Sequence, residues 1–364
     1  MGAASLELSI IIPVFNEEAS LGSLFSMLAR QREVSFEVLL ADGGSTDGTT
    51  ARAASLALAS PFPCRLLSCE RGRGRQLNIG ARAAAAEMLL FLHADSGFPD
   101  SLALRKGLDA LAASGDMRVA GRYALRFVLP AARYAFGYYF YECKARLDRP
   151  ECTHGDQGFL LRRSFFSEIG PFDESFPLLE DTRLAERVRR EGRWLLLPTE
   201  ILTSARRFET EGLCERQLLN ALIMNFAAIG WGEFFRVVFG VYRSQDLARR
   251  LRLLPIFRAI RELLQQSPRR QRFALWQRTG AYVRPNAWQL VFALDTHRNF
   301  RRGLPPGDGE TPLLKWFDRW YGPLTDHPPG RLAAAALVWL WFQLTLLWLR
   351  FREEEEPGGS SPAN

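Results

Sequence analysis

Short clusters of charged residues and glycine have the composition that a site for a phosphorylated ligand needs. His93 and Asp95 follow an apolar run, where a carboxylate is well placed to hold a divalent cation against a diphosphate. Arg71, Arg73 and Arg75 alternate with glycine before an expected helix, and guanidinium groups at a helix start suit phosphate oxygens. Each cluster also has a simpler interpretation, because acidic residues cap many loops and a basic turn can be merely solvated.

Three further clusters lie in expected turns. The loop 42–48, Asp-Gly-Gly-Ser-Thr-Asp-Gly, either lets a ligand approach its backbone closely or is a tight turn held by its own short side chains. Asp156 and Gln157 lie between two glycines in another turn. Glu180 and Asp181 stand at the entrance of a helix, which they could also simply cap.

The elements that would position these clusters alternate between strand and helix. Apolar runs predict strands at residues 8–15, 36–41, 65–68 and 88–92. Amphipathic or Ala-rich segments predict helices at residues 16–30, 49–59 and 78–86. Consecutive strand, loop and helix units predict an open α/β sheet, whose ligands gather at the carboxyl ends of its strands. The clusters at 42–48 and 93–96 lie at such ends.

The rest of the sequence completes a division of the whole chain into four segments. Strands near 121–128, 158–162, 194–198 and 202–208 and a helix at 182–191 complete a first domain, residues 1–230. A basic helical extension follows at 231–330, in which 245–266 is the clearest amphipathic helix. An apolar helix covers 331–352, and the acidic, then Gly/Ser/Pro-rich tail 353–364 is expected to be disordered.

The segment 332–349 has eighteen residues, is polar only at Gln343 and Thr345, and is flanked by arginine at both ends. As a helix it would extend about 27 Å, slightly less than a hydrocarbon core of about 30 Å. Its three tryptophans are of the kind that anchors helices at membrane interfaces. The pattern fits a single membrane span or a helix that lies in the plane of the membrane or packs on the domain.

Composition narrows the classes of function. The 364 residues are 47% hydrophobic and 24% charged, which is globular and excludes a disordered or fibrous protein. The net charge is +7, but only three of the 47 Lys and Arg residues are lysine, a bias typical of a GC-rich coding sequence. No nucleic-acid-binding motif accompanies the charge, so anionic lipid is a better partner than nucleic acid. Five cysteines without a CxxC pair predict reduced thiols, and the absence of leader-like N-terminal regions predicts a cytoplasmic location.

Taken together and in order, these segments resemble glycosyltransferase family 2, whose members are inverting enzymes with the GT-A fold. The resemblance covers residues 8–230. IIIPVFNEE resembles the first strand and Asn-Glu turn of the family, ADGGSTDGT its nucleotide-binding loop, FLHADS the place of its DxD metal motif, and LLEDTRLAERVRREG its Glu-Asp motif and following helix. Within the family, ERGRGRQLNIGA, HADS, GDQG and SARRF are most similar to the branch named rSAM/selenodomain-associated transferase 2, a bacterial group in which tryptophan is usual at the position of Phe208.

The resemblance implies transfer of a sugar from a nucleoside diphosphate, most simply a UDP-sugar, to an acceptor hydroxyl. Asp181 would accept the acceptor proton, with Glu180 beside it. Asp95 would hold a divalent metal, Mn²⁺ or Mg²⁺. His93 replaces the first aspartate of the metal motif, and it would either ligate the metal or position the loop.

The same resemblance implies a set of donor-binding residues. Those expected at the base and ribose are Pro13, Glu17 and Asp42, and those expected at the diphosphate are Arg71, Arg73 and Arg75. Asp156 and Gln157 would face the donor sugar or the acceptor, and Asn78 belongs to the same donor-binding set. The predicted fold is therefore an α/β, GT-A type open sheet with helices on both faces, followed by a helical extension and one apolar helix.

The apolar helix and the basic helices favour a lipid or lipid-linked acceptor at the cytoplasmic face of a bacterial inner membrane. Two other functions stay open: an inactive membrane scaffold of the same fold that lost metal binding with the first aspartate of the motif, and a sugar-nucleotide nucleotidyltransferase. The second is disfavoured because Asn16, Glu17 and Glu18 stand where a Gly-rich, Arg-containing loop would be expected. A glycoside hydrolase would need a carboxylate separation that a sequence does not give. Donor, acceptor and oligomeric state also stay open.

Overall fold

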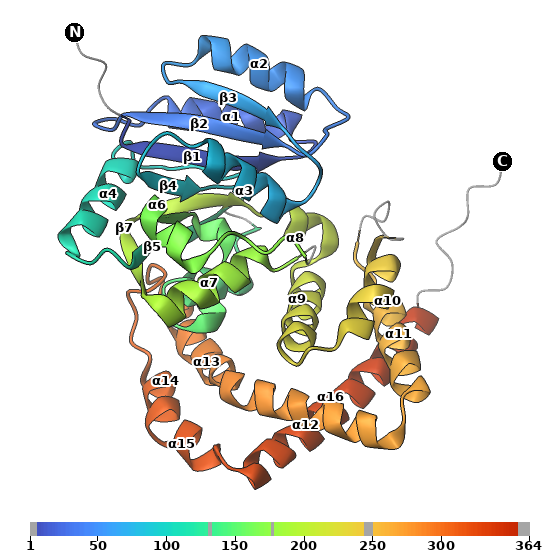
Figure 1. Cartoon of the computed structure of the whole chain (residues 1–364). Helices are drawn as coiled ribbons and strands as arrows, with labels where there is room; N and C mark the ends of the chain where they lie inside the picture. The colour runs from blue at the N-terminus through green and yellow to red at the C-terminus, as the bar shows by residue number, and fades with distance from the viewer. Residues whose placement is uncertain (1–5, 130–132, 176–177, 244–249, 356–364) are drawn as a thin grey trace, which may run out of the picture. The chain divides into compact units, whose positions relative to one another are not determined.

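The computed structural model describes residues 6–129, 133–175, 178–243 and 250–355 (Figure 1). The chain divides into two compact units, Met1–Ser204 and Ala205–Asn364. The division falls directly after the last strand, so the helix Leu213–Ala228, which lies within the expected domain 1–230, belongs to the second unit.

The first unit is built on one mixed sheet of seven strands in the order β3-β2-β1-β4-β6-β5-β7. The neighbours from β3 to β4 are parallel, β6 is antiparallel to both of its neighbours, and β5 pairs with β7 in parallel. The α/β sheet predicted from the sequence is thereby confirmed. The strands are β1 (Leu8–Val14), β2 (Phe36–Asp42), β3 (Cys64–Ser68), β4 (Met88–Phe91), β5 (Val119–Val128), β6 (Phe159–Arg162) and β7 (Arg193–Ser204).

Helices cover both faces of this sheet (Figure 1), which is why the central strands are apolar on both sides. Every residue of β2 is buried, and so is all of β1 except Pro13. One core cluster joins the strands to the helices through side chains such as Leu39, Phe91, Leu161 and Leu184. The helices of this unit are α1 (Glu18–Leu28), α2 (Thr49–Ala59), α3 (Arg73–Ala83), α4 (Ala103–Ala113), α5 (Phe136–Lys144), α6 (Arg163–Ile169) and α7 (Glu180–Glu191), with short 3₁₀ turns at Pro150–Cys152 and Gly155–Gln157.

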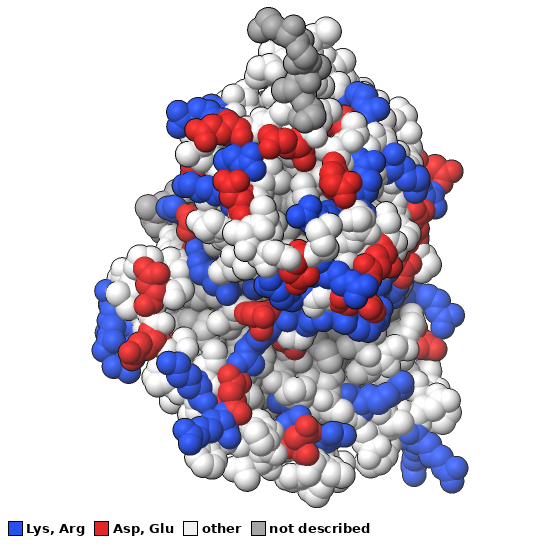
Figure 2. Space-filling model, turned by 60° about the vertical axis from the view of Figure 1, so that its left-hand side comes forward, with Lys and Arg blue, Asp and Glu red and all other residues white. Residues whose placement is uncertain are grey.

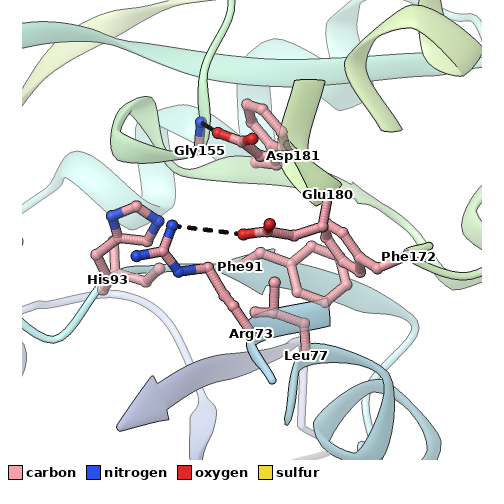
Figure 3. Close-up of a pocket in the computed structure, with 10 residues that line it drawn as sticks. Arg73, Leu77, Phe91, His93, Gly155, Phe172, Glu180 and Asp181 are labelled. Atoms are coloured by element: carbon pink, nitrogen blue, oxygen red, sulfur yellow. Dashed lines mark hydrogen bonds and ion pairs between the residues drawn. The ribbon is translucent and has the colours of Figure 1, made fainter. Parts of the chain in front are cut away.

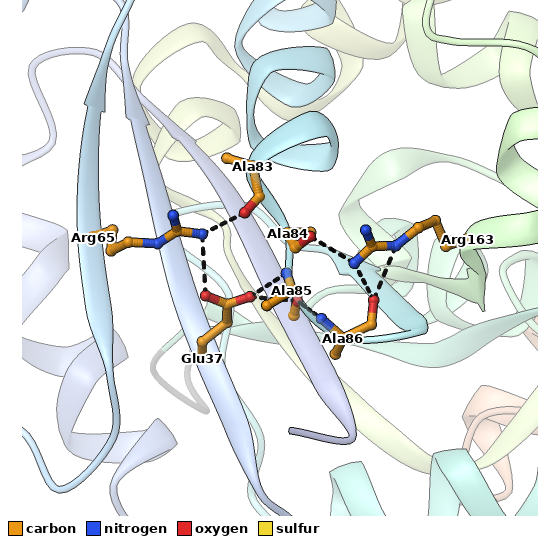
Figure 4. Close-up of polar contacts among 8 residues, drawn as sticks. Glu37, Arg65, Ala83, Ala84, Ala85, Ala86 and Arg163 are labelled. Atoms are coloured by element: carbon orange, nitrogen blue, oxygen red, sulfur yellow. Dashed lines mark hydrogen bonds and ion pairs between the residues drawn. The ribbon is translucent and has the colours of Figure 1, made fainter. Parts of the chain in front are cut away.

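Helix α3 is fixed at its carboxyl end by two arginines and a buried glutamate (Figure 4). Arg163 donates to the carbonyls of Ala84 (2.6 Å) and Ala86, and Arg65 donates to that of Ala83. Glu37 accepts the N–H of Ala85 at 2.6 Å and pairs with Arg65 at 3.3 Å. The arginines donate to backbone carbonyls that the end of the helix leaves unpaired. Because α3 is rigid, anchoring this end also fixes its amino end, which carries Arg73.

Two predicted boundaries are wrong in ways that affect the site. Helix α3 begins at Arg73 rather than at residue 78, so Arg73 and Arg75 stand in its first turn. The strands expected at 194–198 and 202–208 are one strand, β7, which ends at Ser204, and Phe208 lies in the helix α8 (Arg206–Glu211). Pro198 does not break β7 because this strand is at the edge of the sheet, where a missing N–H is tolerated.

The second unit is helical in its described residues, as the sequence predicts for the extension. Residues 245–249 of the helix expected at 245–266 lie outside the described residues, and the observed helix begins at Leu253. Residues 353–355 of the expected disordered tail are helical, and 356–364 lie outside the described part. Besides α8, the helices are α9 (Leu213–Ala228), α10 (Gly232–Arg243), α11 (Leu253–Gln266), α12 (Arg269–Asn286), α13 (Trp288–Arg301), α14 (Pro312–Trp316), α15 (Gly322–Thr325) and α16 (Pro328–Glu355), with a π turn at Phe317–Tyr321.

Within the described chain, one helix is long and apolar enough to cross a membrane by length and composition. It is the segment Pro328–Arg352 of α16, with a mean hydropathy of 1.9. All five cysteines are free thiols, as predicted. Basic and acidic side chains lie side by side over much of the face in Figure 2, so the excess of arginine does not form one uninterrupted patch there.

Candidate active site

The loops that follow β1 and β2 are joined by hydrogen bonds. Ser45 Oγ accepts the N–H of Asn16 at 2.9 Å, and Asn16 Oδ1 accepts the N–H of Thr46 at 2.9 Å. Thr49 Oγ1 accepts the N–H of Glu17 at 2.8 Å. Asn16 has a φ of 56°, a left-handed conformation that asparagine tolerates better than most residues. The two predicted donor-binding loops are therefore held side by side at the carboxyl end of the sheet.

The side chain of Asp42 forms hydrogen bonds within its own loop. Its carboxylate accepts the N–H of Gly44 at 3.1 Å and the hydroxyl of Ser45 at 2.5 Å. The Asx-type turn considered for this loop is thus present. Pro13 lies in β1 opposite Ala41 of β2, and Glu17 accepts the hydroxyl of Ser20 at 2.8 Å.

Gln76 was not among the predicted site residues, yet it ties three elements together. From α3 its amide nitrogen donates to the carbonyls of Val14 and Ala41, both at 2.8 Å, and it is buried. A Cβ on Gly43 would lie only 3.1 Å from the Gln76 amide, so the glycine leaves room for this contact. Gln76 was missed because the sequence has no pattern that identifies a glutamine bound to two strand ends. Its place in the Arg-Gly segment was the one available signal.

The three arginines of that segment have different surroundings. Arg73 pairs with Glu180 at 3.4 Å, whereas Arg75 pairs with Glu70 and, at 3.3 Å, with Glu174. The Arg71 guanidinium lies 4.0 Å from the centre of the Phe15 ring, within the range of a cation–π contact. Asn78 is buried: its side chain donates to the carbonyl of Phe172 (2.9 Å) and to Glu174 (2.8 Å) and accepts the Phe172 N–H (2.8 Å). Only Arg73 of these residues lines the pocket described next.

A pocket brings Arg73 together with the predicted catalytic pair and His93 (Figure 3). The carboxylate of Asp181 accepts the N–H of Gly155 at 2.7 Å and the N–H of Thr182 at 2.7 Å. A Cβ placed on Gly155 would lie 3.1 Å from both Asp181 Oδ2 and His93 Nε2, so these two side chains flank the glycine. The pocket is lined by Arg73, Leu77, Phe91, Leu92, His93, Gly155, Phe159, Phe172, Glu180 and Asp181.

The backbone before α7 is strained at Leu179. Its φ is 63°, in the left-handed region that a leucine rarely adopts and that costs about 1–2 kcal/mol. This turn directs the chain so that α7 starts with Glu180 and Asp181 at the pocket. Strain of this kind is retained where the surrounding structure requires it, and it is common at functional sites.

The two acids at the start of α7 have opposite pKa shifts. Burial and the neighbouring Asp181 raise the pKa of Glu180, although Arg73 acts against this. Burial also raises the pKa of Asp181, but His154, the N–H of Gly155 and Arg73 outweigh it, so the pKa is lowered overall. Burial lowers the pKa of His154 and favours its neutral form, so we attribute the charged state of Asp181 mainly to the N–H donors and Arg73. Asp181 is therefore a carboxylate at neutral pH.

Asp156 is the least satisfied acid of the site. Burial, Asp181 and Asp95 raise the pKa of Asp156 to about 7, and its Oδ1 atom is buried with no hydrogen-bond partner. Gln157, next to it, is buried and faces inward: its amide nitrogen donates to the carbonyl of Ala145 at 2.8 Å, and its oxygen accepts the N–H of His154 at 3.0 Å. Gln157 thus shapes the turn that presents Asp156.

The donor atoms near Asp156 fit a divalent cation. Among the described residues no three His, Cys, Asp or Glu side chains form a complete metal-binding group. Asp95 and Asp156 nevertheless interact electrostatically, and the unpartnered oxygen of Asp156 is one that a cation would satisfy. A hard cation often takes one or two carboxylates from the protein and its remaining ligands from substrate phosphates, which is the set available here.

The family model Glycosyl transferase family 2 matches residues 9–170. The chain is similar to the succinoglycan biosynthesis protein ExoA of Rhizobium meliloti, with 29% identity over 196 residues, which is 50% of this chain and 58% of that protein. It is also similar to the undecaprenyl-phosphate 4-deoxy-4-formamido-L-arabinose transferase of Aeromonas hydrophila, with 36% identity over 92 residues, 24% of this chain and 28% of that protein.

Among solved structures, the chain is similar to the mannosyltransferase PcManGT of Pyrobaculum calidifontis in complex with GDP-Man and Mn²⁺. The TM-score is 0.49 and the identity 19%, over 95% of this chain and 88% of that one. The mixed α/β sheet with helices on both faces is the architecture that the resemblance implied. The family match at residues 9–170 and the names of the curated relatives support a glycosyltransferase of family 2. The chain spans less than two thirds of the length of either curated relative named here.

Proposed function

We propose that the protein is an inverting glycosyltransferase of the hexosyl type, which transfers a sugar from a nucleoside diphosphate sugar to an acceptor hydroxyl at a membrane. The observation that carries this proposal is the pocket in which the Asp181 carboxylate lies beside His93, with Arg73 and Glu180 next to it (Figure 3). The pocket combines one ionised base with a cationic group, as a single displacement at a sugar carbon requires.

In the proposed reaction the acceptor oxygen forms a bond to the anomeric carbon while the bond from that carbon to the diphosphate oxygen breaks. Asp181 accepts the hydroxyl proton, and the electron pair of the broken bond leaves with the diphosphate. One displacement without a covalent enzyme intermediate inverts the configuration. Arg73 contributes positive charge where the leaving group becomes more negative. A divalent cation, for which Asp95 and Asp156 offer carboxylate ligands, would supply further positive charge when bound, and His93 would then position the loop.

We propose a UDP-sugar as the donor. The joined loops after β1 and β2 would bind the nucleoside, with Pro13, Glu17 and Asp42 shaping this surface. The segments at 70–81, 155–158 and 204–208 support placing the chain in the rSAM/selenodomain-associated transferase 2 branch. The proposed acceptor is a lipid or lipid-linked molecule at the cytoplasmic face of a bacterial inner membrane. The apolar helix α16 and the relative from Aeromonas, which is named for undecaprenyl-phosphate, support this acceptor class.

A thermal-shift panel on the full chain in mild detergent tests this proposal. UDP, GDP, CDP and dTDP are each added with Mn²⁺ or with a chelator. We expect UDP to raise the melting temperature only with Mn²⁺, since a ligand at 100 times its Kd adds about 2.7 kcal/mol to the folded state. Asp95→Asn should lose the metal-dependent part, whereas the exposed Glu186→Gln on α7 should keep it. No shift with any nucleotide would leave the inactive scaffold as the better explanation.

A further inference from the structure

The second unit exposes an apolar helix face that its own packing leaves uncovered. Only 22% of the apolar window of α16 is buried. Leu337, Leu344 and Phe351, spaced by seven residues and so on one side of the helix, are 67%, 56% and 58% exposed. Trp339, Trp341 and Trp348 are exposed as well. A contiguous apolar surface of this length is unusual in water and marks a binding surface.

The opposite side of α16 is docked along its length on α11 and α12. Ala335, Phe342, Leu346 and Leu349 form the buried stripe. Phe342 stacks on Phe257 of α11 with ring centres 5.2 Å apart. Near its start α16 touches α12 backbone to backbone, since a Cβ on Gly280 would lie 2.5 Å from the nitrogen of Ala335. Because α16 is packed along one whole side, it can enter a membrane only together with α11 and α12 or after separating from them.

Helix α12 cannot follow α16 into hydrocarbon. In eighteen residues it carries five arginines: Arg269, Arg270, Arg272, Arg278 and Arg284. Arginine near the centre of a bilayer is strongly unfavourable. A membrane span by α16 would therefore require α16 to leave its buried stripe, or α12 to enter the bilayer with its charges. Neither is needed if α16 lies in the plane of the membrane with its exposed side in one leaflet.

One arginine–tryptophan pair lies near the carboxyl end of α16, and another lies in the π turn that precedes α16 in the sequence. The Arg352 guanidinium lies 5.4 Å from the ring centre of Trp348, and that of Arg319, in the π turn that precedes α15, lies 5.3 Å from Trp320. Such pairs place an aromatic ring in the interface and a cation among the head groups. Arg350 adds positive charge at the carboxyl end, where Glu353, Glu354 and Glu355 follow in the same helix, and Arg331 at the other end pairs with Asp326 at 2.9 Å. Together with the five arginines of α12, which packs along α16, these pairs complement anionic head groups better than a second protein chain does.

We propose that α16 is an in-plane membrane anchor, which inserts its exposed apolar side into one leaflet of an anionic membrane while its other side stays docked on α11 and α12. The inference rests on the second unit alone and does not depend on the proposed reaction.

Depth measurements on the full chain distinguish this anchor from a span. In a Cys214→Ser background, which removes the exposed cysteine, a fluorophore is attached at Leu337→Cys, Leu344→Cys or Phe351→Cys. Quenchers at known depths in vesicles then locate each label. An in-plane helix places all three at one shallow depth. A span would separate neighbouring labels by about 10 Å in depth, because seven helical residues rise by that amount, and this result would overturn the proposal.

Vesicle flotation tests the lipid preference. The chain should float with vesicles of phosphatidylcholine and phosphatidylglycerol and bind pure phosphatidylcholine more weakly. The Arg350→Gln/Arg352→Gln variant should lose about fivefold in affinity for the anionic vesicles per charge, whereas Arg190→Gln on α7 should not. Equal binding to both vesicle types would contradict the anionic preference.

A variant of the apolar side completes the test. Leu337→Gln/Leu344→Gln/Trp348→Gln should bind vesicles at least about tenfold more weakly, with unchanged circular dichroism, because the substituted side chains are solvent-exposed in the unbound protein. Leu58→Gln, which changes an exposed leucine of α2, is the matched control and should bind as the wild type does. Failure of the wild type to bind any vesicle, together with a dimer in sedimentation, would show that a second copy covers this face and would overturn the proposal.

Discussion

Replacing Asp181 by asparagine separates proton transfer from binding, because the two side chains have nearly the same shape. The carboxylate accepts N–H groups on both oxygens, from Gly155 and from Thr182, each at 2.7 Å. Asparagine has one acceptor oxygen, so its NH₂ group must face one of these donors. An unsatisfied buried donor costs about 1–3 kcal/mol, and we expect a stability loss of that size. Losing the base should lower turnover by about 10²–10⁴-fold.

The assay follows release of the nucleoside diphosphate from the donor, with water as a slow acceptor, so that the natural acceptor is not needed. Nucleotide binding is measured separately by thermal shift. Glu186→Gln, on the same helix and exposed, controls for a general effect of removing a carboxylate. Turnover of Asp181→Asn within about threefold of the wild type would refute the assignment of Asp181 as the base. Loss of nucleotide binding with unchanged turnover at saturation would refute it equally, since the residue would then act in binding.

Two further predictions concern other residues of the site, and a third concerns the packing of α3. Asp156→Asn should raise the melting temperature at pH 8 and not at pH 4. The pKa of Asp156 is raised to about 7 in the folded protein, so the wild-type protein loses stability as pH rises from about 4 to 7, and the variant does not. An equal gain in melting temperature at both pH values, measured by calorimetry, would contradict this. Arg73→Gln should lower turnover about 10- to 100-fold in the same release assay, because it removes positive charge near the leaving diphosphate. Turnover equal to that of the wild type would contradict this role. Gly80→Ala should destabilise the protein by about 1–3 kcal/mol in urea unfolding, because the added Cβ would lie 2.3 Å from Ile11. Gly232→Ala, which has open space around it, is the control and should not destabilise the protein. Equal urea midpoints for the two variants would contradict the packing argument.

The sheet could be predicted from the sequence wherever local pattern and tertiary environment agree. The buried parallel strands β1 and β2 are continuous apolar runs, and the Ala-rich helix expected at 49–59 has the bounds of α2. The position of the site at the carboxyl ends of the strands followed from the same alternation. His93 was found in this way, whereas Glu180 and Asp181 were noted at a helix entrance and their role was implied by the family resemblance; all three line one pocket.

The start of α3 could not be predicted, because the contacts that fix it are distant in sequence. An Arg-Gly repeat has low helix propensity and no apolar period. In the structure Gly74 lies against the carbonyl of Asp173, where a Cβ would be only 2.9 Å away, and Asn78 is tied to Phe172 by two hydrogen bonds. These contacts bring a loop from a hundred residues away onto the first turns of the helix. Tertiary packing here overrides local preference, and it places Arg73 in the pocket.

The same pocket shows why a site of this kind gives up stability before it binds anything. Asp156 keeps a buried oxygen without a partner, Glu180 is buried beside a charged neighbour, and Leu179 holds a left-handed backbone. Each feature is unfavourable in the free protein. A ligand that brings positive charge or a hydrogen-bond donor to these groups recovers part of that cost only when it is bound. Groups left unsatisfied by the fold are therefore the ones best able to discriminate for such a ligand, and Asp156, whose Oδ1 atom is buried without a hydrogen-bond partner, is the clearest of them.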